Sequence, residues 1–539
     1  MDSMGTESRS ASFQQQAVTL MVSTLIVRFL GWAYRVWMTG IVGDSGMGFN
    51  GAAYYIYMFI LIFSSAGLPA AISKMVSERV AMRQYKEAHR VFQTALVIAA
   101  IFGAAGSLLL VLTARALSSL STIHETYYSL IALSPTILIA AISAVYRGYF
   151  QGMHNTVPTA VSQVTEQLFN AIFSVVFAFI LVKGGQEYGA AGGSIGTGIG
   201  AAAGVLIIVG IYQLLSPYIK KRITSPFSSR VSLARPINLA GELLRTAWPI
   251  IIGMAVYTLS NLVDIFLVPR RLTASGAFTY DQITSMYGIL TNKYASLITM
   301  PVSFSTAVAV AAVPNIASAV KLRDADGVNA KINDGLRLSM LLSIPAAIGL
   351  TVLGNPIIRM LYPSFPDGGV LMEFGSISII FLAVTQTVTG MLQGIGKVKI
   401  PVLGALAGVA VKIIFNYILI AIPSVNVVGA VISTTLCYVV AGAVNVYFLR
   451  KYTRARLDVN GAFLKPLGAS AVMGLVCYVF YYTFYYISGS NAAAALLSIA
   501  LGAAVYFFLM AAVGGIDAKY ANRIPLVGKM VRKVTGMLR

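Results

Sequence analysis

Residues 151–170 read QGMHNTVPTAVSQVTEQLFN, and residues 393–416 read QGIGKVKIPVLGALAGVAVKIIFN. Both stretches begin with Gln-Gly, contain a proline and end in asparagine. Four positions before that asparagine stands an ionisable residue, which is Glu166 in the first stretch and Lys412 in the second. The two stretches therefore look like copies of one segment in which the charge has been reversed.

The composition around these stretches is that of a membrane protein. Hydrophobic residues make up 57% of the 539 residues and charged residues only 11%, whereas a soluble domain is about half apolar and about a quarter charged. Apolar runs of about 20 residues, enough to cross a bilayer, recur along the whole chain. They are continuous and do not alternate as in a membrane β-barrel. The sequence therefore predicts an all-α polytopic membrane protein.

Length and hydropathy predict about 14 transmembrane helices. We place them at residues 17–41, 50–76, 91–114, 127–150, 157–182, 189–216, 245–268, 284–319, 337–361, 370–392, 399–422, 428–449, 464–487 and 492–514. The eighth segment is too long for one straight crossing, which indicates a helix that is tilted, broken or partly outside the bilayer.

The net charge of +21, from 39 basic and 18 acidic residues, reflects membrane topology in this interpretation and not nucleic-acid binding. Segments after even-numbered spans, with the C-terminal tail, hold about 28 of the basic residues and segments after odd-numbered spans only about 5, and such an excess marks cytoplasmic loops. We therefore expect both termini in the cytoplasm. Basic loops such as RKYTRAR (450–456) would attract anionic membrane lipids.

The two halves of the chain look related beyond the quoted stretches. Arg35 near the outer end of the first span corresponds to Asp264 in the seventh, and Pro69 in the second corresponds to Pro314 in the eighth. Two repeats of six spans, followed by two further helices, are typical of transporters with a site near the bilayer midplane. The predicted domains are an N-lobe (1–219), a basic cytoplasmic linker (220–244), a C-lobe (245–450), helices 13 and 14 (451–514) and a basic amphipathic cytoplasmic tail (515–539).

Motifs of catalysis are missing from the sequence. It contains no G-x-x-x-x-G-K-[ST] loop, no H-E-x-x-H motif and no Cys/His cluster, so we expect neither an enzyme nor a cofactor or metal site. The glycine-rich run GGSIGTGIGAAAG (192–204) lies inside a predicted span. Its glycines stand four residues apart, which favours a bare stripe for close helix packing over a nucleotide loop.

We single out seven ionisable residues within predicted spans, where a charge usually faces a cavity or a partner because an isolated one is costly. They are Arg28, Arg35, Lys74, Glu166, Asp264, Lys293 and Lys412. Five are cations, which suits an anionic substrate, and arginine matches phosphate oxygens with two donors. Lys74 and Lys293 lie near span ends and could instead extend to the membrane surface, whereas Arg28 lies halfway along its span.

The relation between the halves also predicts ion pairs. If the repeats superpose, Arg35 and Glu166 correspond to Asp264 and Lys412, and we predict the pairs Arg35–Glu166 and Asp264–Lys412. The alternative is that each pair only holds its lobe together. Breaking a buried pair costs roughly 3–5 kcal/mol in either case.

Four stretches resemble a known family: RFLGWAYR (28–35), AGLPAAISKMVSE (66–78), YRGYFQGMHNTVPTAVSQVTEQ (146–167) and LQGIGKVKIP (392–401). They are similar to polysaccharide-transport members of the multidrug/oligosaccharidyl-lipid/polysaccharide exporter superfamily, in particular to Firmicute lipid II flippases and stage V sporulation protein B. The resemblance covers nearly the whole chain. It implies two six-helix lobes in a V around a cationic cavity, alternating access, and a groove formed by the last two helices for a polyprenyl tail.

The resemblance also implies roles for single residues. In lipid II flippases, cations of helices one, two and eight bind the pyrophosphate. Arg28 matches the arginine three residues before the glycine of helix one, here Gly31, while Lys74 and Lys293 match only by helix.

The second lobe departs from the family pattern. Gram-negative relatives hold a sodium ion between helices seven, eleven and twelve. Asp264 and Asn416 could serve here, but Lys412 lies toward the same place and would repel or replace the ion. We therefore expect transport that does not depend on sodium.

These observations predict a flippase of the bacterial inner membrane. It would move a polyprenyl-pyrophosphate-linked cell-wall precursor, lipid II for peptidoglycan, from the inner to the outer leaflet. Arg28 and Arg35 would bind the pyrophosphate, with Lys74 at the cytoplasmic mouth and Lys293 at the outer one. We expect a monomer with cell-wall synthases as partners. The alternatives are a flippase for a teichoic-acid or capsule precursor, a cation-coupled drug exporter, and a non-transporting scaffold.

Overall fold

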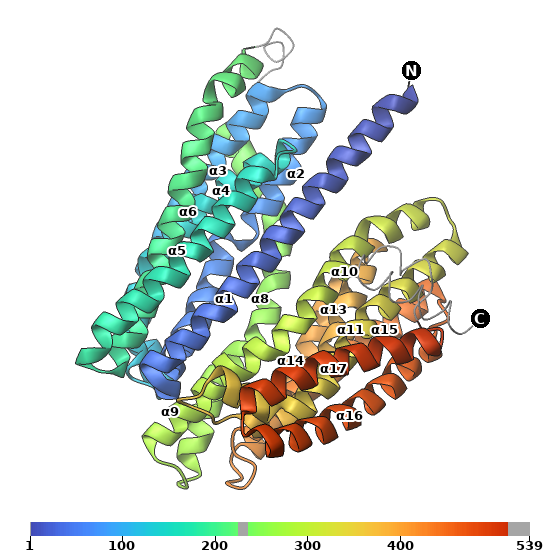
Figure 1. The fold of residues 1–539 in the computed structure, drawn as a ribbon. Helices are drawn as coiled ribbons and strands as arrows, with labels where there is room; N and C mark the ends of the chain where they lie inside the picture. The colour runs from blue at the N-terminus through green and yellow to red at the C-terminus, as the bar shows by residue number, and fades with distance from the viewer. Residues whose placement is uncertain (1, 225–234, 516–539) are drawn as a thin grey trace. The chain divides into compact units, whose positions relative to one another are not determined.

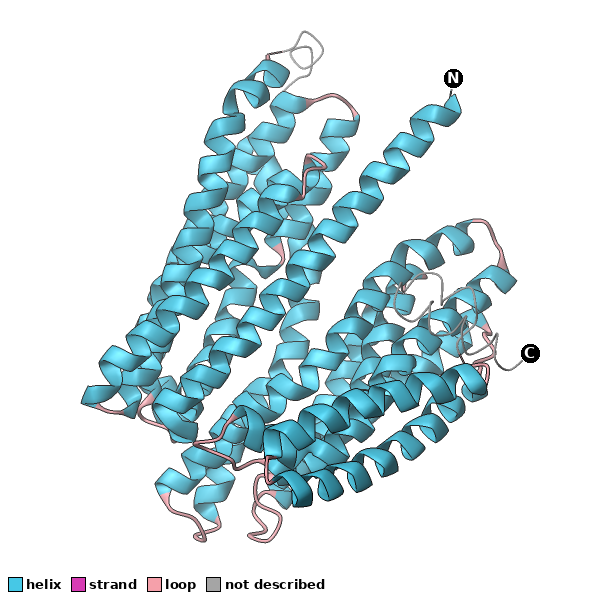
Figure 2. Cartoon of the chain, in the orientation of Figure 1, coloured by secondary structure: helices cyan, strands magenta, loops and turns pink. Residues whose placement is uncertain are grey.

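The computed structural model describes residues 2–224 and 235–515. Throughout these residues the regular secondary structure is helical and includes no strand (Figure 2). The all-α fold that the composition predicts is therefore confirmed. The predicted amphipathic tail and the centre of the predicted linker lie outside the described residues.

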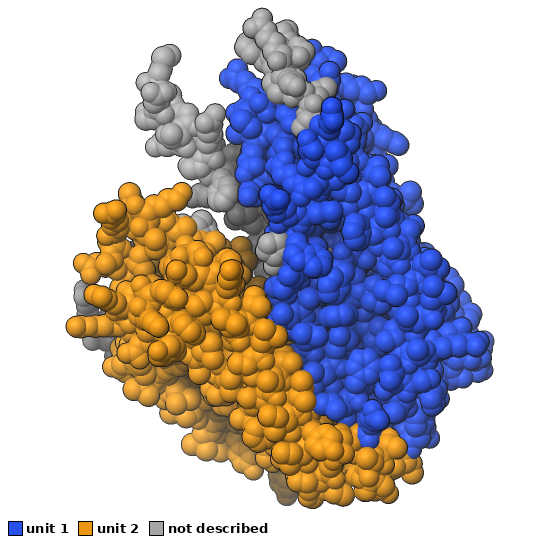
Figure 3. All heavy atoms as spheres, turned by 180° about the vertical axis from the view of Figure 1, so that it is seen from behind, with its two compact units in different colours: residues 1–270, 280–288 blue, residues 271–279, 289–539 orange. Residues whose placement is uncertain are grey.

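The chain forms two compact units (Figure 3), of which the first comprises Met1–Arg270 and Tyr280–Gly288. Its helices (Figure 1) are α1 (Asp2–Leu61), α2 (Leu68–Ala81), α3 (Tyr85–Leu120), α4 (Thr126–Gly152), α5 (Val157–Leu181), α6 (Gln186–Ile223), α8 (Pro236–Ala274, as far as Arg270) and α9 (Tyr280–Gly288). A π-helical turn, η1 (Ile62–Ala66), leads from α1 to α2. The predicted lobe boundary at 220–244 remains a prediction.

Helix α1 changes direction at Gly43. This residue has φ 70° and ψ 179°, and two helices are joined there across a kink. A side chain would clash with the backbone in that conformation, so glycine is the residue that permits the reversal. The first two predicted spans are thus one long helical segment with a glycine break between them.

The glycine stripe of α6 packs against α5. A Cβ atom on Gly196 would lie 2.1 Å from the Ser174 amide nitrogen, and one on Gly200 would lie 2.5 Å from the Glu166 carbonyl oxygen. No side chain fits at these distances, so the two helix backbones approach as closely as the stripe allows. The predicted packing role of these glycines is confirmed.

The second unit comprises Arg271–Thr279 and Ile289–Arg539. Its helices are the π-helix η3 (Ile289–Tyr294), α10 (Ala295–Lys321), α11 (Ala325–Leu361), α12 (Gly369–Gly375), α13 (Ser378–Gly394), α14 (Lys399–Leu419), α15 (Val428–Thr453), η4 (Asn460–Leu464), α16 (Lys465–Ser488) and α17 (Asn491–Ala512). The last helix is fixed to α11, because Tyr506 donates to the Leu341 carbonyl at 2.7 Å and Asn491 donates to the Pro356 carbonyl at 3.1 Å.

Twelve segments of the described chain are long and apolar enough to span a membrane, or thirteen when α12 and α13, bent by 53°, count as one span. The first of them, Ile26–Ala81, contains the kink at Gly43 and therefore holds two spans. With that division the segments agree with the fourteen predicted spans. At the eighth predicted span the structure has one continuous helical segment, Tyr280–Lys321, in which the π-helix η3 joins α9 to α10 without a loop.

Candidate functional site

The first unit carries two arginines on one face of α1. Arg28 and Arg35 are seven residues apart, which is close to two helical turns and about 10 Å along the axis. Arg28 is exposed and Arg35 is partly exposed. The Arg35 guanidinium lies 5.7 Å from the centre of the Tyr54 ring, in a cation–π arrangement. The structure thus places both predicted phosphate-binding arginines on an accessible face of one apolar helix.

Asp264 belongs to the same group of charges. Tyr55 lies within electrostatic range of both Arg35 on α1 and Asp264 on α8. Both helices contribute these residues to the first unit. Lys412, the partner predicted for Asp264, lies in the second unit, and the pair Asp264–Lys412 stays a prediction.

Glu166 has a different partner from the one that the sequence suggests. Its carboxylate accepts a hydrogen bond and forms an ion pair with the Nη2 of Arg147, which lies on α4. Nη2 of Arg147 also donates to the Ser162 hydroxyl at 2.9 Å, and that hydroxyl donates to the Gly204 carbonyl at 3.1 Å. The predicted pair Arg35–Glu166 is therefore wrong about the partner of Glu166.

Arg147 is a functional candidate that the sequence interpretation missed. It lies in YRGYFQG, inside the predicted span 127–150 but only three residues from its end. Such a cation is easily taken for one that extends to the membrane surface. Its side chain is instead only 16% exposed and turned toward Glu166. The signal that could have found it is its place inside the family-like stretch 146–167, which includes Glu166 itself.

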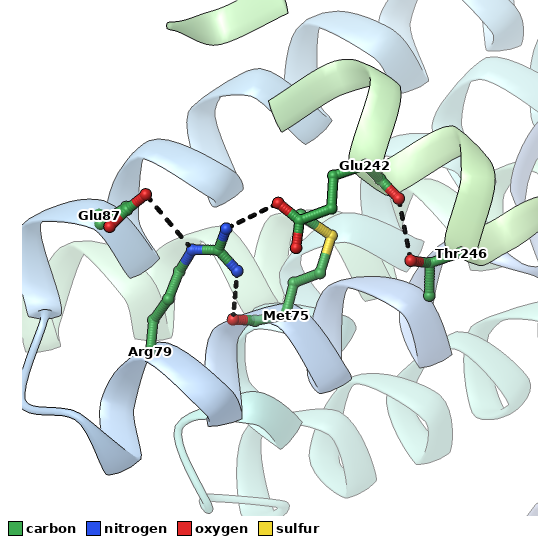
Figure 4. A network of polar contacts seen from close by, with 5 residues as sticks. All are labelled: Met75, Arg79, Glu87, Glu242 and Thr246. Atoms are coloured by element: carbon green, nitrogen blue, oxygen red, sulfur yellow. Dashed lines mark hydrogen bonds and ion pairs between the residues drawn. The ribbon is translucent and has the colours of Figure 1, made fainter. Parts of the chain in front are cut away.

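Lys74 lies on the exposed side of α2. One turn further on, Arg79 is buried and ties three helices together (Figure 4). Its Nη1 donates to the Met75 carbonyl at 3.1 Å, its Nη2 contacts Glu242 Oε2 at 2.8 Å, and its Nε lies 3.8 Å from Glu87 Oε1. Glu242 is near the start of α8, so this network attaches that helix to α2 and α3.

Lys293 in the second unit is fully buried, with 0% of its surface exposed. Its ammonium donates to the carbonyls of Phe365 at 2.7 Å and Asp367 at 3.0 Å, and it lies 5.1 Å from the centre of the Tyr362 ring. These three partners belong to the segment that follows α11. In this structure the lysine binds its own chain, and a role in contacting substrate stays a prediction.

Tyr294, the next residue of η3, makes a second attachment. Its hydroxyl donates to the Gly375 carbonyl at 3.2 Å and lies 3.0 Å from the Ser378 hydroxyl. These residues border the bend between α12 and α13. All six residues of η3 are buried, and a π-helical turn redirects side chains relative to an α-helix. Adjacent residues of η3 thereby fix two separate segments of the second unit.

Lys412 and Asn416 lie one turn apart on the buried face of α14. They are 1% and 0% exposed, whereas Ile413 and Ile414 between them face outward. A lysine and an asparagine inside a packed unit must be solvated by polar groups of the protein. The structure therefore brings these two predicted residues together and places them within the second unit.

Long apolar helices that carry a few internal charges define the protein as a multi-pass membrane protein. The comparisons agree: the sequence model of the family "Polysaccharide biosynthesis protein" matches residues 13–320, and the MatE model matches residues 249–418. The chain belongs to the polysaccharide biosynthesis protein family, within the multidrug/oligosaccharidyl-lipid/polysaccharide exporter superfamily. It is a transporter and not an enzyme.

Two relatives from Bacillus subtilis (strain 168) match over almost their whole length. The lipid II flippase MurJ is 27% identical over 96% of this chain and 98% of its own. Stage V sporulation protein B is 25% identical over 96% of this chain and 99% of its own. Among solved structures, the lipid II flippase MurJ in an inward closed conformation has a TM-score of 0.68 at 18% identity, over 91% of this chain and 98% of that one. The family resemblance that the four sequence stretches indicate is confirmed.

Proposed function

We propose that this protein is a flippase that moves a lipid-linked, anionic glycan between the leaflets of the membrane, and that its cargo is lipid II. The observation that carries the proposal is the pair of arginines on α1. Arg28 is exposed within an apolar helix that is long enough to span the bilayer, and Arg35 follows two turns later. Low-dielectric surroundings strengthen the attraction of such cations for an anion.

The chemistry of the two arginines fits a pyrophosphate. Each guanidinium can bind two phosphate oxygens in a planar fork, and a pyrophosphate offers two adjacent phosphates. A spacing of about 10 Å along the helix allows one arginine to bind first and the other to receive the group as it moves. Arg35 is held in position by the Tyr54 ring, so it is prepared for binding before the cargo arrives.

The relatives support the same class of cargo. One relative that aligns along nearly the whole chain is a lipid II flippase, and the family is described by polysaccharide biosynthesis. A glycan on a lipid carrier joined by pyrophosphate satisfies both descriptions. Arg28 and Arg35 would then form the binding group of the first unit, with Lys74 near its entrance.

The proposed transport is alternating access with both termini in the cytoplasm. The cargo would enter from the inner leaflet and favour the outward state only by the difference in its affinity for the two states. In the second unit, the buried ammonium of Lys412 beside Asn416 would occupy the place of a bound cation. We therefore expect transport that is independent of sodium.

The experiment uses cells that are depleted of their own lipid II flippase and express this chain. Lipid II on the outer leaflet is measured by its cleavage with an externally added enzyme. We expect accessible lipid II with the wild-type chain, and a decrease of about tenfold or more for Arg28→Ala, since a hydrogen bond between charged groups contributes roughly 1.5–3 kcal/mol.

Arg115→Ala serves as the matched control, because Arg115 is an exposed arginine near the end of α3 that lies 5.6 Å from the Tyr127 ring. It should leave accessibility unchanged at equal expression. Absence of accessible lipid II with a well-expressed wild-type chain would reject lipid II as the cargo. Equal effects of the two substitutions would reject the role of Arg28.

A further inference from the structure

A basic pocket lies at the polar end of α15, outside the groups of charges described above. Its volume is about 740 Å³, and its cations are Arg450, Lys451, Arg454 and Arg456. These residues come from RKYTRAR, a basic loop that the charge pattern predicts to attract anionic membrane lipids without indicating a defined site. We call this cavity the α15 pocket.

The wall of the α15 pocket is built by a sharp turn of the chain. Arg454 ends α15 in a left-handed conformation with φ 52° and ψ 23°, and its amide donates to the Arg450 carbonyl at 2.8 Å. The next residue, Ala455, is buried. The turn folds the following segment back beside the helix, so that cations before and after it line the same cavity.

Helix α11 holds this wall in place. The Arg456 amide donates to Asn329 Oδ1 at 3.1 Å, and Asn333 Nδ2 donates to the Arg456 carbonyl at 2.9 Å. Asn333 Oδ1 also accepts from the Asp458 amide at 2.8 Å. With its backbone fixed by two asparagines, the pocket is formed before any ligand binds.

The cations of the α15 pocket have no acidic neighbour in its lining. Within residues 2–224 and 235–515, none of the four takes part in an ion pair. A smaller cavity of about 300 Å³ nearby has a different character, because Asp324 lies beside Arg323 in its lining and Lys397 is 4.6 Å from the Tyr452 ring. Of these two cavities, the α15 pocket is thus the one whose lining holds cations and no acidic residue.

The opposite end of the pocket is apolar. Ala443, Val446 and Tyr447 line it, and the Tyr447 side chain is 62% exposed. They precede Arg450 by one to two turns on a helix that qualifies as membrane-spanning. The apolar end therefore faces the hydrocarbon region while the cations lie at the level of the lipid headgroups.

We propose that the α15 pocket binds an anionic phospholipid. Its phosphate would contact Arg450 and Arg454, with Lys451 and Arg456 around it, and an acyl chain would lie along Ala443, Val446 and Tyr447. Guanidinium groups recognise phosphate with paired donors, and basic pockets at the edges of membrane helices suit anionic headgroups. This site is separate from the arginines of α1 and does not depend on the proposed cargo.

The test is native mass spectrometry of the purified full-length protein, titrated with phosphatidylglycerol or with phosphatidylcholine of the same acyl chains. The wild type should bind phosphatidylglycerol more tightly. The double substitution Arg450→Gln/Arg454→Gln should weaken that binding by about 25-fold, since one basic residue near an anionic lipid contributes about 1 kcal/mol, or about fivefold. Phosphatidylcholine binding should not change.

The matched control is Arg323→Gln/Lys397→Gln, which removes the same charge from the neighbouring cavity and should leave phosphatidylglycerol binding within about twofold, as surface cations at a distance act weakly. Equal losses in the two double variants would overturn the proposal, as would a wild type without preference for the anionic lipid. Displacement of the lipid by inorganic phosphate alone would also overturn it. If the double variant does not fold, Arg454→Gln alone should lose about fivefold.

Discussion

Two arginines of the first unit and two lysines of the second unit differ in how far they are buried. In the first unit Arg28 is exposed and Arg35 is partly exposed. In the second unit Lys293 and Lys412 are 0% and 1% exposed. The ammonium of Lys293 is bound by two backbone carbonyls. The arginines therefore keep part of their surface accessible, whereas the ammonium of Lys293 joins segments of its own chain.

The difference teaches that a charge within a membrane span is not by itself a binding site. Its cost can be offset by a substrate, by a carboxylate as for Arg147 and Glu166, or by carbonyl oxygens as for Lys293. The residue types agree with this division. An arginine presents a planar fork to an incoming phosphate, while a lysine is a compact charge that three acceptors can surround.

The largest effect is expected for Lys293→Met. Methionine preserves the volume of the side chain but leaves the carbonyls of Phe365 and Asp367 without their donor. A buried acceptor without a partner costs about 1–3 kcal/mol, so we expect the free energy of unfolding to fall by roughly 2–4 kcal/mol. Denaturant unfolding of the purified protein in detergent micelles measures this change.

Lys321→Met provides the control on the same span. Lys321 lies exposed in the last turn of α10, where a cation contributes about 0.5 kcal/mol through the helix dipole. Lys293→Met also removes the cost of burying a charge. If it lowers the free energy of unfolding as little as Lys321→Met does, the removed cost cancels the lost hydrogen bonds. The contrast between the two units would then disappear.

The sequence predicted the helices better than the pairs. The spans follow from hydropathy and the stripe of α6 from glycine spacing, because both are local patterns. The partner of Glu166 depends on which neighbour its side chain reaches, and the correspondence between the halves predicted Arg35 in place of Arg147. Similar positions in two repeats do not guarantee the same contacts, because a shift of one residue rotates a side chain by about 100° toward a different helix.

The burial of Lys293 could not be predicted for a different reason. Its acceptors are backbone carbonyls 72 and 74 residues away, and a carbonyl leaves no signature in a sequence. The π-helical turn that redirects the side chain has no reliable pattern either. Near the end of an apolar run, a lysine that extends to the membrane surface and a buried one therefore look alike.

An intermediate effect is expected for Glu166→Gln. The side chains of Arg147 and Glu166 are 16% and 34% exposed, and Arg147 keeps the Ser162 hydroxyl when the carboxylate is neutralised. We expect a loss of about 1 kcal/mol in the free energy of unfolding, between the values of exposed and buried pairs. Unfolding in detergent micelles is again the measurement.

A double-mutant cycle with Arg147→Gln isolates the pair. The sum of the two single losses in the free energy of unfolding should exceed the loss in the double variant. The difference, which is the coupling energy, should be about 0.5–1 kcal/mol. A parallel cycle of Glu166→Gln with Arg35→Gln should give a coupling near zero. Coupling to Arg35 as large as that to Arg147 would restore the pairing that the sequence suggested and make the charges of the first unit one shared network.

The smallest effect is expected for Glu242→Gln at the start of α8. Glu242 is 46% exposed and its partner Arg79 keeps the Met75 carbonyl and Glu87. An exposed pair contributes about 0.2–1 kcal/mol, so global unfolding should barely change. Hydrogen–deuterium exchange of the first turns of α8 should still accelerate, by up to about fivefold, because the link to α2 and α3 is weaker.

Salt and a matched carboxylate decide whether that acceleration comes from the ion pair. Raising the salt from 0.1 M toward 1 M shortens the screening length from about 10 to about 3 Å, so wild-type exchange should approach that of Glu242→Gln. Glu78→Gln removes an exposed carboxylate next to Arg79 that takes no part in the network, and it should leave exchange in α8 unchanged.

If Glu78→Gln accelerates exchange as strongly as Glu242→Gln does, the start of α8 responds to net charge alone. If neither substitution acts, apolar packing such as that of Ile251 near Gly67 holds α8 in the first unit, and Arg79 matters only within α2 and α3.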